Sequence, residues 1–151
     1  MTESTRSNVV SLPVSSKVLC GCYAAIALSA LIGTWSQNTA YLGEPATFLT
    51  AFVQDLTVTA ASRSFSADLL LFFLSAAILM TVEARKHGVR FVWVYIIAGV
   101  LIAISVTFPL FLIARELRIA GTSPSEMRSA DALGLAALAV VTAAVTIWVV
   151  V

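Results

Sequence analysis

Four long apolar runs dominate this chain and restrict what it can fold into. They cover about residues 18–35, 65–82, 91–114 and 132–151, and most charged residues flank them rather than interrupt them. A helix that crosses the hydrocarbon core of a bilayer needs roughly 17–25 predominantly apolar residues, so each run is long enough. The sequence therefore predicts an all-α integral membrane protein, a four-helix bundle.

Composition supports a bilayer rather than water as the solvent of this chain. Hydrophobic residues make up 60% of the 151 residues and charged residues 11%, whereas soluble domains carry about 25% charged residues. The mean hydropathy of +0.98 excludes a disordered chain. The formal net charge of +1 provides no electrostatic surface for nucleic acid. We therefore expect membrane lipid as a partner and no nucleic acid.

Two segments outside the apolar runs, residues 1–16 and 46–58, carry predictions of their own. Residues 1–16 are rich in Ser and Thr and lack an apolar period, which predicts a disordered cytoplasmic tail ahead of a transmembrane bundle over 17–151. Residues 46–58 place their apolar side chains on one helical face. They predict a short amphipathic helix between the first two spans, which either lies on the membrane surface or caps the bundle.

Basic residues near the span ends set the expected orientation. With four spans, the bias is weak overall, but Arg85, Lys86 and Arg90 crowd the short turn between the second and third runs. This turn predicts that the N-terminus and the C-terminus are both cytoplasmic. A cleaved signal peptide is the alternative for the first run, although no small-x-small cleavage site follows it.

Small side chains recur along the first and fourth predicted helices at the spacing of one helical face. In lipid, helices associate through close backbone approach, so small residues mark contact faces. These faces either pack the bundle internally or bind another membrane protein, and the fourth helix is the better candidate for the second role. The residues are Gly21, Ala25, Ser29 and Gly33 in the first helix and Ala132, Ala136, Ala139 and Ala143 in the fourth.

Asp68 is the one acid that enters an apolar run, directly before a stretch of Leu and Phe. A carboxylate near hydrocarbon is costly unless it is paired, wetted or turned to the bundle interior. Three interpretations stay open: a first-turn acid stabilised by the helix dipole, an ion pair with Arg63, or a proton or ligand site. In the third case Ser105 and Thr107 of the next helix would line a polar cavity with Asp68.

Pro109 lies inside the third run, where it removes a backbone donor and frees the carbonyl of Ser105. The sequence predicts a kink at this position. The kink either bends the helix to fit its neighbours or opens a small polar cavity beside Ser105 and Thr107.

Catalytic and metal-binding motifs are missing from the sequence. It contains no phosphate-binding glycine loop, nucleophile elbow or paired catalytic acids. His87 has no second ligand at metal spacing, and Cys20 and Cys22 lie on roughly opposite faces of a helix. We therefore expect no enzymatic activity, no metal and no cofactor.

Two stretches together resemble a known family. One begins at Arg63-Ser-Phe-Ser-Ala-Asp-Leu69 and continues to Glu83-Ala-Arg-Lys86 and Trp93, and the other is Thr107-Phe-Pro-Leu-Phe-Leu-Ile-Ala-Arg-Glu116. They resemble the bacterial membrane family called domain of unknown function 2834, over roughly residues 17–117, with an extra C-terminal helix. The resemblance implies an integral membrane protein without an established activity. It draws attention to Asp68, Glu83, Arg85, Pro109, Arg115 and Glu116.

Two functional hypotheses follow. The first is an accessory or structural subunit of a larger membrane assembly, such as a lipid or solute transporter in the bacterial cytoplasmic membrane, with other membrane proteins as partners. The second is a small carrier or lipid-binding module with a polar cavity around Asp68.

Overall fold

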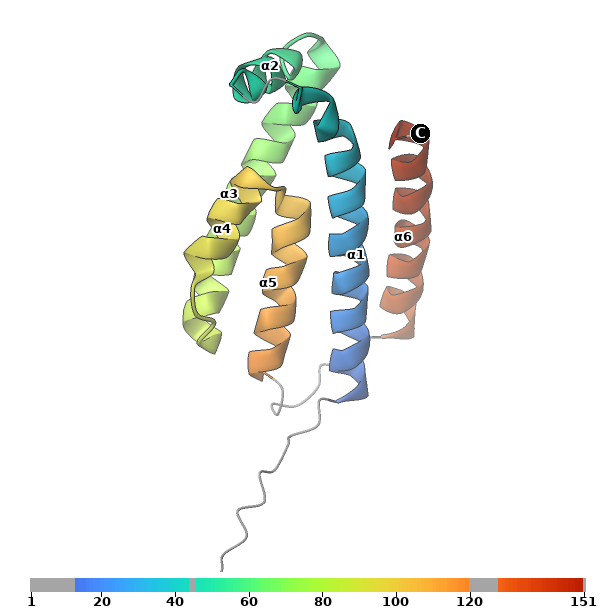
Figure 1. Ribbon diagram of the computed structural model, residues 1–151. Helices are drawn as coiled ribbons and strands as arrows, with labels where there is room; N and C mark the ends of the chain where they lie inside the picture. Colours follow the sequence, from blue (N-terminus) through green and yellow to red (C-terminus); the bar gives the residue numbers. More distant parts are fainter. Residues whose placement is uncertain (1–12, 44–45, 120–127, 151) are drawn as a thin grey trace, which may run out of the picture.

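The computed structural model describes residues 13–43, 46–119 and 128–150, and the described residues are helices joined by turns (Figure 1). In chain order the elements are α1 (Val14–Asn38), the short 3-10 turn η1 (Thr39–Tyr41), α2 (Phe48–Asp55), α3 (Ala60–His87), α4 (Val92–Leu101), α5 (Ile104–Ile119) and α6 (Ser129–Val150). Among them, α1 with η1, α3 and α6 are long and apolar enough to cross a membrane. The predicted all-α class is confirmed.

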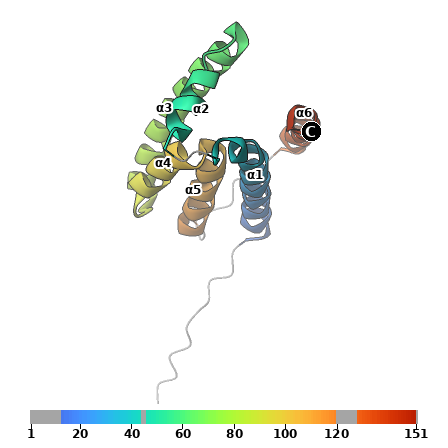
Figure 2. The ribbon, with the colours of Figure 1, turned by 45° about the horizontal axis from the view of Figure 1, so that its top comes forward.

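The long helices lie alongside one another in a curved row (Figure 2). α5 packs against α1 on one side and against α3 and α4 on the other. α6 lies at the edge of the row beyond α1, and α2 lies across the end where α1 finishes and α3 begins (Figure 1). α5 therefore holds the row together from its middle.

The third apolar run differs from its prediction, because it forms two helices that pack against each other instead of one span. α4 and α5 are joined by Ile102 and Ala103, and α4 runs back alongside α5. The rings of Tyr95 and Phe111 have centroids 5.8 Å apart. A straight helix would separate two residues sixteen positions apart by about 24 Å. The single span predicted over 91–114 is therefore corrected to a helical hairpin.

The chain reverses at Ile102 and Ala103, six positions before the kink predicted at Pro109. Pro109 lies within α5, which continues past it to Ile119. Pro109 is the sixth residue of α5, past the first turn, so it removes one backbone hydrogen bond within the helix. The helix nevertheless continues, and the proline does not produce the reversal.

A hydrogen bond joins the last described turn of α6 to the end of α1. Gln37 Nε2 donates a hydrogen bond to the carbonyl of Val150 at 3.2 Å, so the C-terminal ends of α1 and α6 lie together. α1 and α6 are thus parallel (Figure 1). If both helices span the membrane, the start of α1 and the end of α6 face opposite sides. The expectation of two cytoplasmic termini, which depended on four consecutive spans, stays a prediction.

α1 begins earlier than the predicted tail allows. The helix starts at Val14, directly after Pro13, whose φ of −53° suits the start of a helix. The boundary of the predicted disordered tail at residue 16 is therefore too late, and residues 1–12 of that tail lie outside the described residues.

Local sequence sets both ends of α3. Thr59 Oγ1 accepts a hydrogen bond from the Ser62 N–H, and Ser62 Oγ accepts one from the Thr59 N–H, both at 3.0 Å. This reciprocal pair is a capping box, which satisfies two otherwise unpaired donors. At the other end Gly88 adopts φ 67°, a left-handed conformation that glycine reaches without a steric penalty.

The amphipathic prediction for residues 46–58 is realised as the shorter helix α2. The rings of Phe48 and Phe52 pack against Tyr41, whose hydroxyl donates to Asp55 Oδ2 at 2.7 Å. Leu49 and Val53 remain exposed on the outer face. α2 thus contacts η1 through one side and offers apolar side chains on another.

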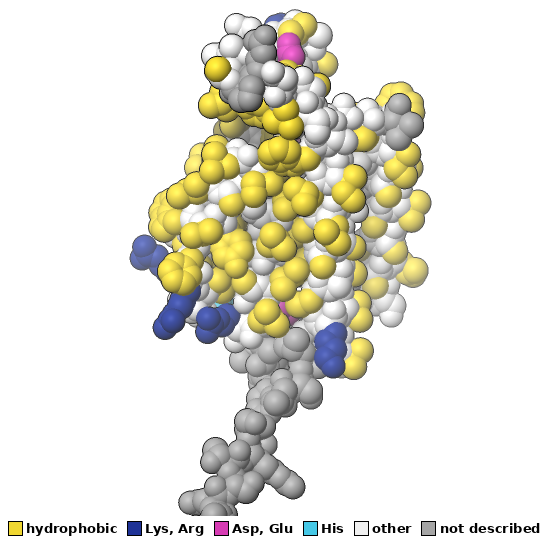
Figure 3. All heavy atoms as spheres, in the orientation of Figure 1, with side chains coloured by type: hydrophobic (Ala, Val, Ile, Leu, Met, Phe, Trp, Pro, Cys, Tyr) yellow, Lys and Arg dark blue, Asp and Glu magenta, His cyan; other side chains and the backbone are white. Residues whose placement is uncertain are grey.

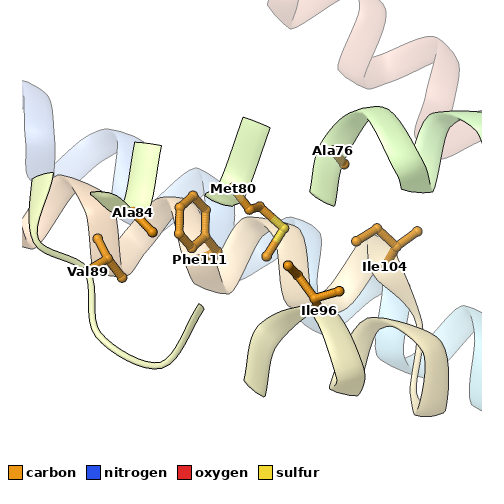
Figure 4. Packing of buried hydrophobic residues seen from close by; sticks show 7 residues of the cluster. All are labelled: Ala76, Met80, Ala84, Val89, Ile96, Ile104 and Phe111. Atoms are coloured by element: carbon orange, nitrogen blue, oxygen red, sulfur yellow. The ribbon is translucent and has the colours of Figure 1, made fainter. Parts of the chain in front are cut away.

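The buried core lies between α3 and the α4–α5 hairpin. Met80 and Phe111 are its largest fully buried side chains. Figure 4 shows Phe111 beside Met80 and Ala84 of α3, with Ile96 of α4 nearby. The hairpin is therefore part of the hydrophobic core and holds α3 in place.

Candidate functional site

Four ionisable side chains meet where α3 and α5 approach their C-terminal ends. Arg115 Nε donates to Glu83 Oε2 at 2.5 Å, and Arg115 Nη1 donates to Glu116 Oε1 at 3.4 Å. His87 Nε2 lies 3.2 Å from the same Glu83 oxygen, without the geometry of a hydrogen bond. We call these four residues the α3–α5 polar cluster.

The polar cluster is largely shielded from solvent. The side chains of Glu83 and Glu116 are 16% and 11% exposed, and that of Arg115 is 28% exposed. Attraction between charges is stronger in such a setting than at a fully wetted surface. One guanidinium therefore faces two carboxylates and joins α3 to α5.

The chain brings these residues together by two different routes. Glu83 and His87 are four positions apart on α3, so they lie on one helical face. Arg115 lies 32 positions from Glu83 and reaches it because the hairpin returns α5 alongside α3. The i,i+4 spacing of Glu83 and His87 was visible in the sequence, but the pairing with Arg115 was not.

Among the described residues, no hydrogen bond or ion pair joins Asp68, Arg63, Ser105 and Thr107, which were proposed for an intramembrane site. Asp68 and Ser105 are exposed, whereas Thr107 is buried. Arg63 Nη1 donates to the carbonyl of Thr57 at 2.8 Å. Within the described part of the chain, no hydrogen bond or ion pair joins Arg63 to Asp68. Two surface depressions adjoin α2, and neither is lined by Asp68, Ser105 or Thr107.

Thr107 faces Gly99 across the hairpin. A Cβ atom added to Gly99 would lie 3.0 Å from Thr107 Oγ1, 3.1 Å from Phe73 Cε2 and 3.3 Å from Ile104 Cδ1. The absence of a side chain at Gly99 therefore allows α4 to approach α5 closely. The Thr107 hydroxyl is buried and makes no hydrogen bond with a described residue. Phe73 belongs to the middle of α3, so the hairpin turn lies near the middle of that helix.

The small-residue faces are mostly uncovered. Gly21, Ala25 and Ser29 of α1 are exposed, and α1 instead turns residues such as Ala27 toward the interior. Gly33 approaches α6, where a Cβ atom would lie 3.9 Å from Thr146 Cγ2. The corresponding face of α6 is also exposed, over Ala132, Ala136, Ala139 and Ala143.

The described residues contain no group of three or more His, Cys, Asp or Glu placed to hold a metal ion. Cys20 and Cys22 are free thiols on α1. The polar cluster itself consists of ion pairs among Glu83, His87, Arg115 and Glu116.

A family model matches residues 22–117, and it describes a protein family of unknown function, DUF2834. The match covers well over half of the chain. The chain belongs to this family. No curated protein and no solved structure matches it significantly. The predicted resemblance is confirmed over nearly the range expected.

The family match separates α6 from the other described helices. The DUF2834 segment contains most of α1, all of α3 and α4, and α5 as far as Leu117. The whole polar cluster therefore lies inside the DUF2834 segment. α6 lies outside it, as the sequence comparison predicted.

Proposed function

We propose that this DUF2834 protein is a non-enzymatic subunit of a larger membrane assembly, such as a lipid or solute transporter in a bacterial cytoplasmic membrane. The exposure of α6 supports the proposal. From Ser129 to Val149 every residue of α6 is exposed, although the helix is apolar and long enough to span. Its C-terminal end contacts α1 through Gln37 and Val150.

The small residues of α6 suggest which of its faces binds a partner. Small side chains let helix backbones approach closely in lipid, which is the main source of helix association there. Ala132, Ala136, Ala139 and Ala143 follow one side of α6, and Val141 lies on the opposite side. Thr146 and Val150 on the same side already contact α1 at the C-terminal end of α6. The proposal therefore places the partner on the alanine side before that contact.

Native mass spectrometry of the full chain, extracted in mild detergent from its own membrane, tests this proposal. We expect the protein to leave the membrane in a complex, and Ala139→Phe to release it by blocking close approach. Val141→Phe adds the same ring on the other side and is the matched control. A lone protomer under every mild condition, or equal loss with both variants, would contradict the proposal.

We also propose an orientation with the start of α1 in the cytoplasm and the end of α6 outside. The α4–α5 hairpin would then enter the membrane from the cytoplasmic side and return to it. This arrangement puts the basic residues of the described chain, apart from Arg63, at one end (Figure 3). Those at that end are Lys17, Arg85, Lys86, Arg90, Arg115, Arg118 and Arg128. Such a bias agrees with the preference of basic residues for the cytoplasmic side.

The alternative of a small carrier with a cavity around Asp68 has less support. Asp68 and Ser105 are exposed on different helices, and the one buried hydroxyl, that of Thr107, faces Gly99. If the protein were a carrier of this kind, Asp68→Asn would abolish ligand transport while leaving folding intact. If it is a subunit of an assembly, as we propose, the same substitution should have no effect on complex formation.

A further inference from the structure

The turn between α3 and α4 carries a concentrated basic surface. Arg85, Lys86 and Arg90 are all exposed. None of them makes an ion pair or a hydrogen bond with another described residue. Figure 3 shows Lys and Arg side chains gathered at this end of the molecule, beside a broad hydrophobic face. Three cationic groups thus project from one short turn without a direct ion pair in the described part of the chain, although Lys86 lies near enough to Glu83 to attract it.

Nearby carboxylates do not neutralise this surface. Glu83 is held by Arg115 and lies against His87, and Glu116 also accepts a hydrogen bond from Arg115. Both carboxylates are mostly shielded from solvent. The polar cluster therefore pairs Glu83 and Glu116 with Arg115 and leaves Arg85, Lys86 and Arg90 available at the surface.

The same turn exposes large aromatic side chains. Phe91 is 77% exposed and Trp93 is 63% exposed. Aromatic rings of this kind concentrate at the boundary between headgroups and acyl chains. Because α3 is long enough to span and ends at His87, the turn lies where a membrane surface would be.

We propose that this turn binds the phosphate headgroup of anionic phospholipids. Arg85, Lys86 and Arg90 contact the phosphate, and Phe91 and Trp93 lie among the upper acyl carbons. Cationic residues beside a span commonly attract anionic headgroups. The adjacent aromatic rings select a lipid over free phosphate, since a soluble ion would gain nothing from them. The inference depends on membrane insertion and does not depend on a role as a subunit.

Lipid retention by the purified full chain tests the proposal. The protein is equilibrated with equal amounts of phosphatidylglycerol and phosphatidylcholine that have identical acyl chains, and bound lipids are counted by native mass spectrometry. We expect the parent to retain phosphatidylglycerol in excess. The triple variant Arg85→Gln/Lys86→Gln/Arg90→Gln should weaken its phosphatidylglycerol binding by about tenfold or more, because each surface charge contributes about fivefold.

A second triple variant tests whether lipid binding depends on this turn in particular or on the total positive charge at this end of the molecule. Lys17→Gln/Arg118→Gln/Arg128→Gln removes equal charge from α1, from α5 and from the start of α6. We expect a change below about twofold with this variant. Equal losses in both triple variants, or no loss in the first, would overturn the proposal.

A second pair of measurements separates a lipid from free phosphate. Excess inorganic phosphate should leave most phosphatidylglycerol bound, and Phe91→Ser/Trp93→Ser should lower retention of both lipids. Complete displacement by inorganic phosphate would show a phosphate site and overturn the lipid proposal. Thermal unfolding of each variant, followed by circular dichroism, must match the parent, as expected for substitutions of exposed side chains.

Discussion

The rings of Tyr95 and Phe111 pack edge to face, with centroids 5.8 Å apart and planes inclined by 76°. Gly99 and Thr107 face each other in the same antiparallel register, one turn closer to the reversal. These two pairs define the α4–α5 hairpin. A run of 24 residues that could have crossed the membrane once instead folds back on itself.

This hairpin changes the arrangement of charge in the whole chain. A single span would carry Arg115, Arg118 and Arg128 to the side opposite Arg85. The hairpin returns the chain, so Arg115 lies beside Glu83 at the end of α3. The clustering of basic residues at one end is thus a consequence of the fold.

Thiol labelling should detect the proposed orientation directly. In a chain with Cys20 and Cys22 replaced by serine, single cysteines are introduced as Arg85→Cys, Arg118→Cys and Thr57→Cys. A membrane-impermeant maleimide applied to spheroplasts should label the Thr57 variant and spare the other two, because the hairpin returns residue 118 to the side of residue 85.

Lysed spheroplasts are the control, since all three variants should then react. Labelling of the Arg118 variant together with the Thr57 variant in intact spheroplasts would mean that residues 91–114 cross the membrane.

Gly99→Val should destabilise the hairpin. A Cβ atom there already lies 3.0–3.3 Å from side-chain atoms of Thr107, Phe73 and Ile104, and valine adds two further carbons. Overpacking of this kind costs about 1–3 kcal/mol. The free energy of unfolding in detergent measures the effect. Gly134→Val is the control, since nothing lies within 4 Å of its added Cβ, and a similar loss in both variants would argue against close packing at Gly99.

Arg115→Leu should destabilise the protein because it leaves the carboxylates of Glu83 and Glu116 without their guanidinium. Removing one partner from a shielded, charged hydrogen bond costs about 1–3 kcal/mol. The double variant Glu83→Gln/Arg115→Gln should lose less than its two single variants together, with a coupling energy of about 0.5–3 kcal/mol. Chemical unfolding of the four proteins measures the coupling.

Arg118→Leu is the control for Arg115→Leu, because Arg118 is exposed on the last turn of α5. Its effect should stay within about 0.5 kcal/mol. Additive single effects at Glu83 and Arg115 would show that the polar cluster does not join α3 to α5.

Thr107→Val should leave the stability unchanged or raise it by up to about 1 kcal/mol. Thr107 is 3% exposed, and its hydroxyl has no hydrogen-bond partner among the described residues. Replacing the hydroxyl with a methyl group therefore removes a buried polar group that is not satisfied. Thr81→Val is the matched comparison, since the Thr81 hydroxyl donates to the Ala77 carbonyl at 2.8 Å. Thermal unfolding distinguishes them, and a clear loss of stability in the Thr107 variant would reveal a partner for its hydroxyl.

The apolar runs located the long helices but made most of them too short. The first two runs lie within α1 and α3, and the fourth matches α6 as far as Val150. α3 extends beyond its apolar run at both ends, because a capping box begins it at Thr59 and left-handed Gly88 ends it. Hydropathy marks the part of a helix that lipid surrounds, whereas hydrogen bonds at the caps mark where the helix stops.

The candidate site was only partly visible in the sequence. Glu83, Arg115 and Glu116 drew attention through the family resemblance, and the structure brings them together. Asp68 stood out because it is an acid in an apolar run, yet it is exposed, and no hydrogen bond or ion pair with another described residue involves its side chain. Unusual polarity identifies a residue, but its partners depend on which helices become neighbours.

The sequence by itself determined that this protein is all-α and that three of its helices are apolar enough to cross a membrane, because long apolar runs with charged flanks favour such helices. Only the tertiary structure decided that residues 91–114 reverse. One long span and two short packed helices have the same hydropathy, so composition cannot separate them. The choice depends on the approach of Gly99 to Thr107 and Phe73 and on the pairing of Tyr95 with Phe111. These are contacts between residues distant in the chain, and they exist only once the helices have packed.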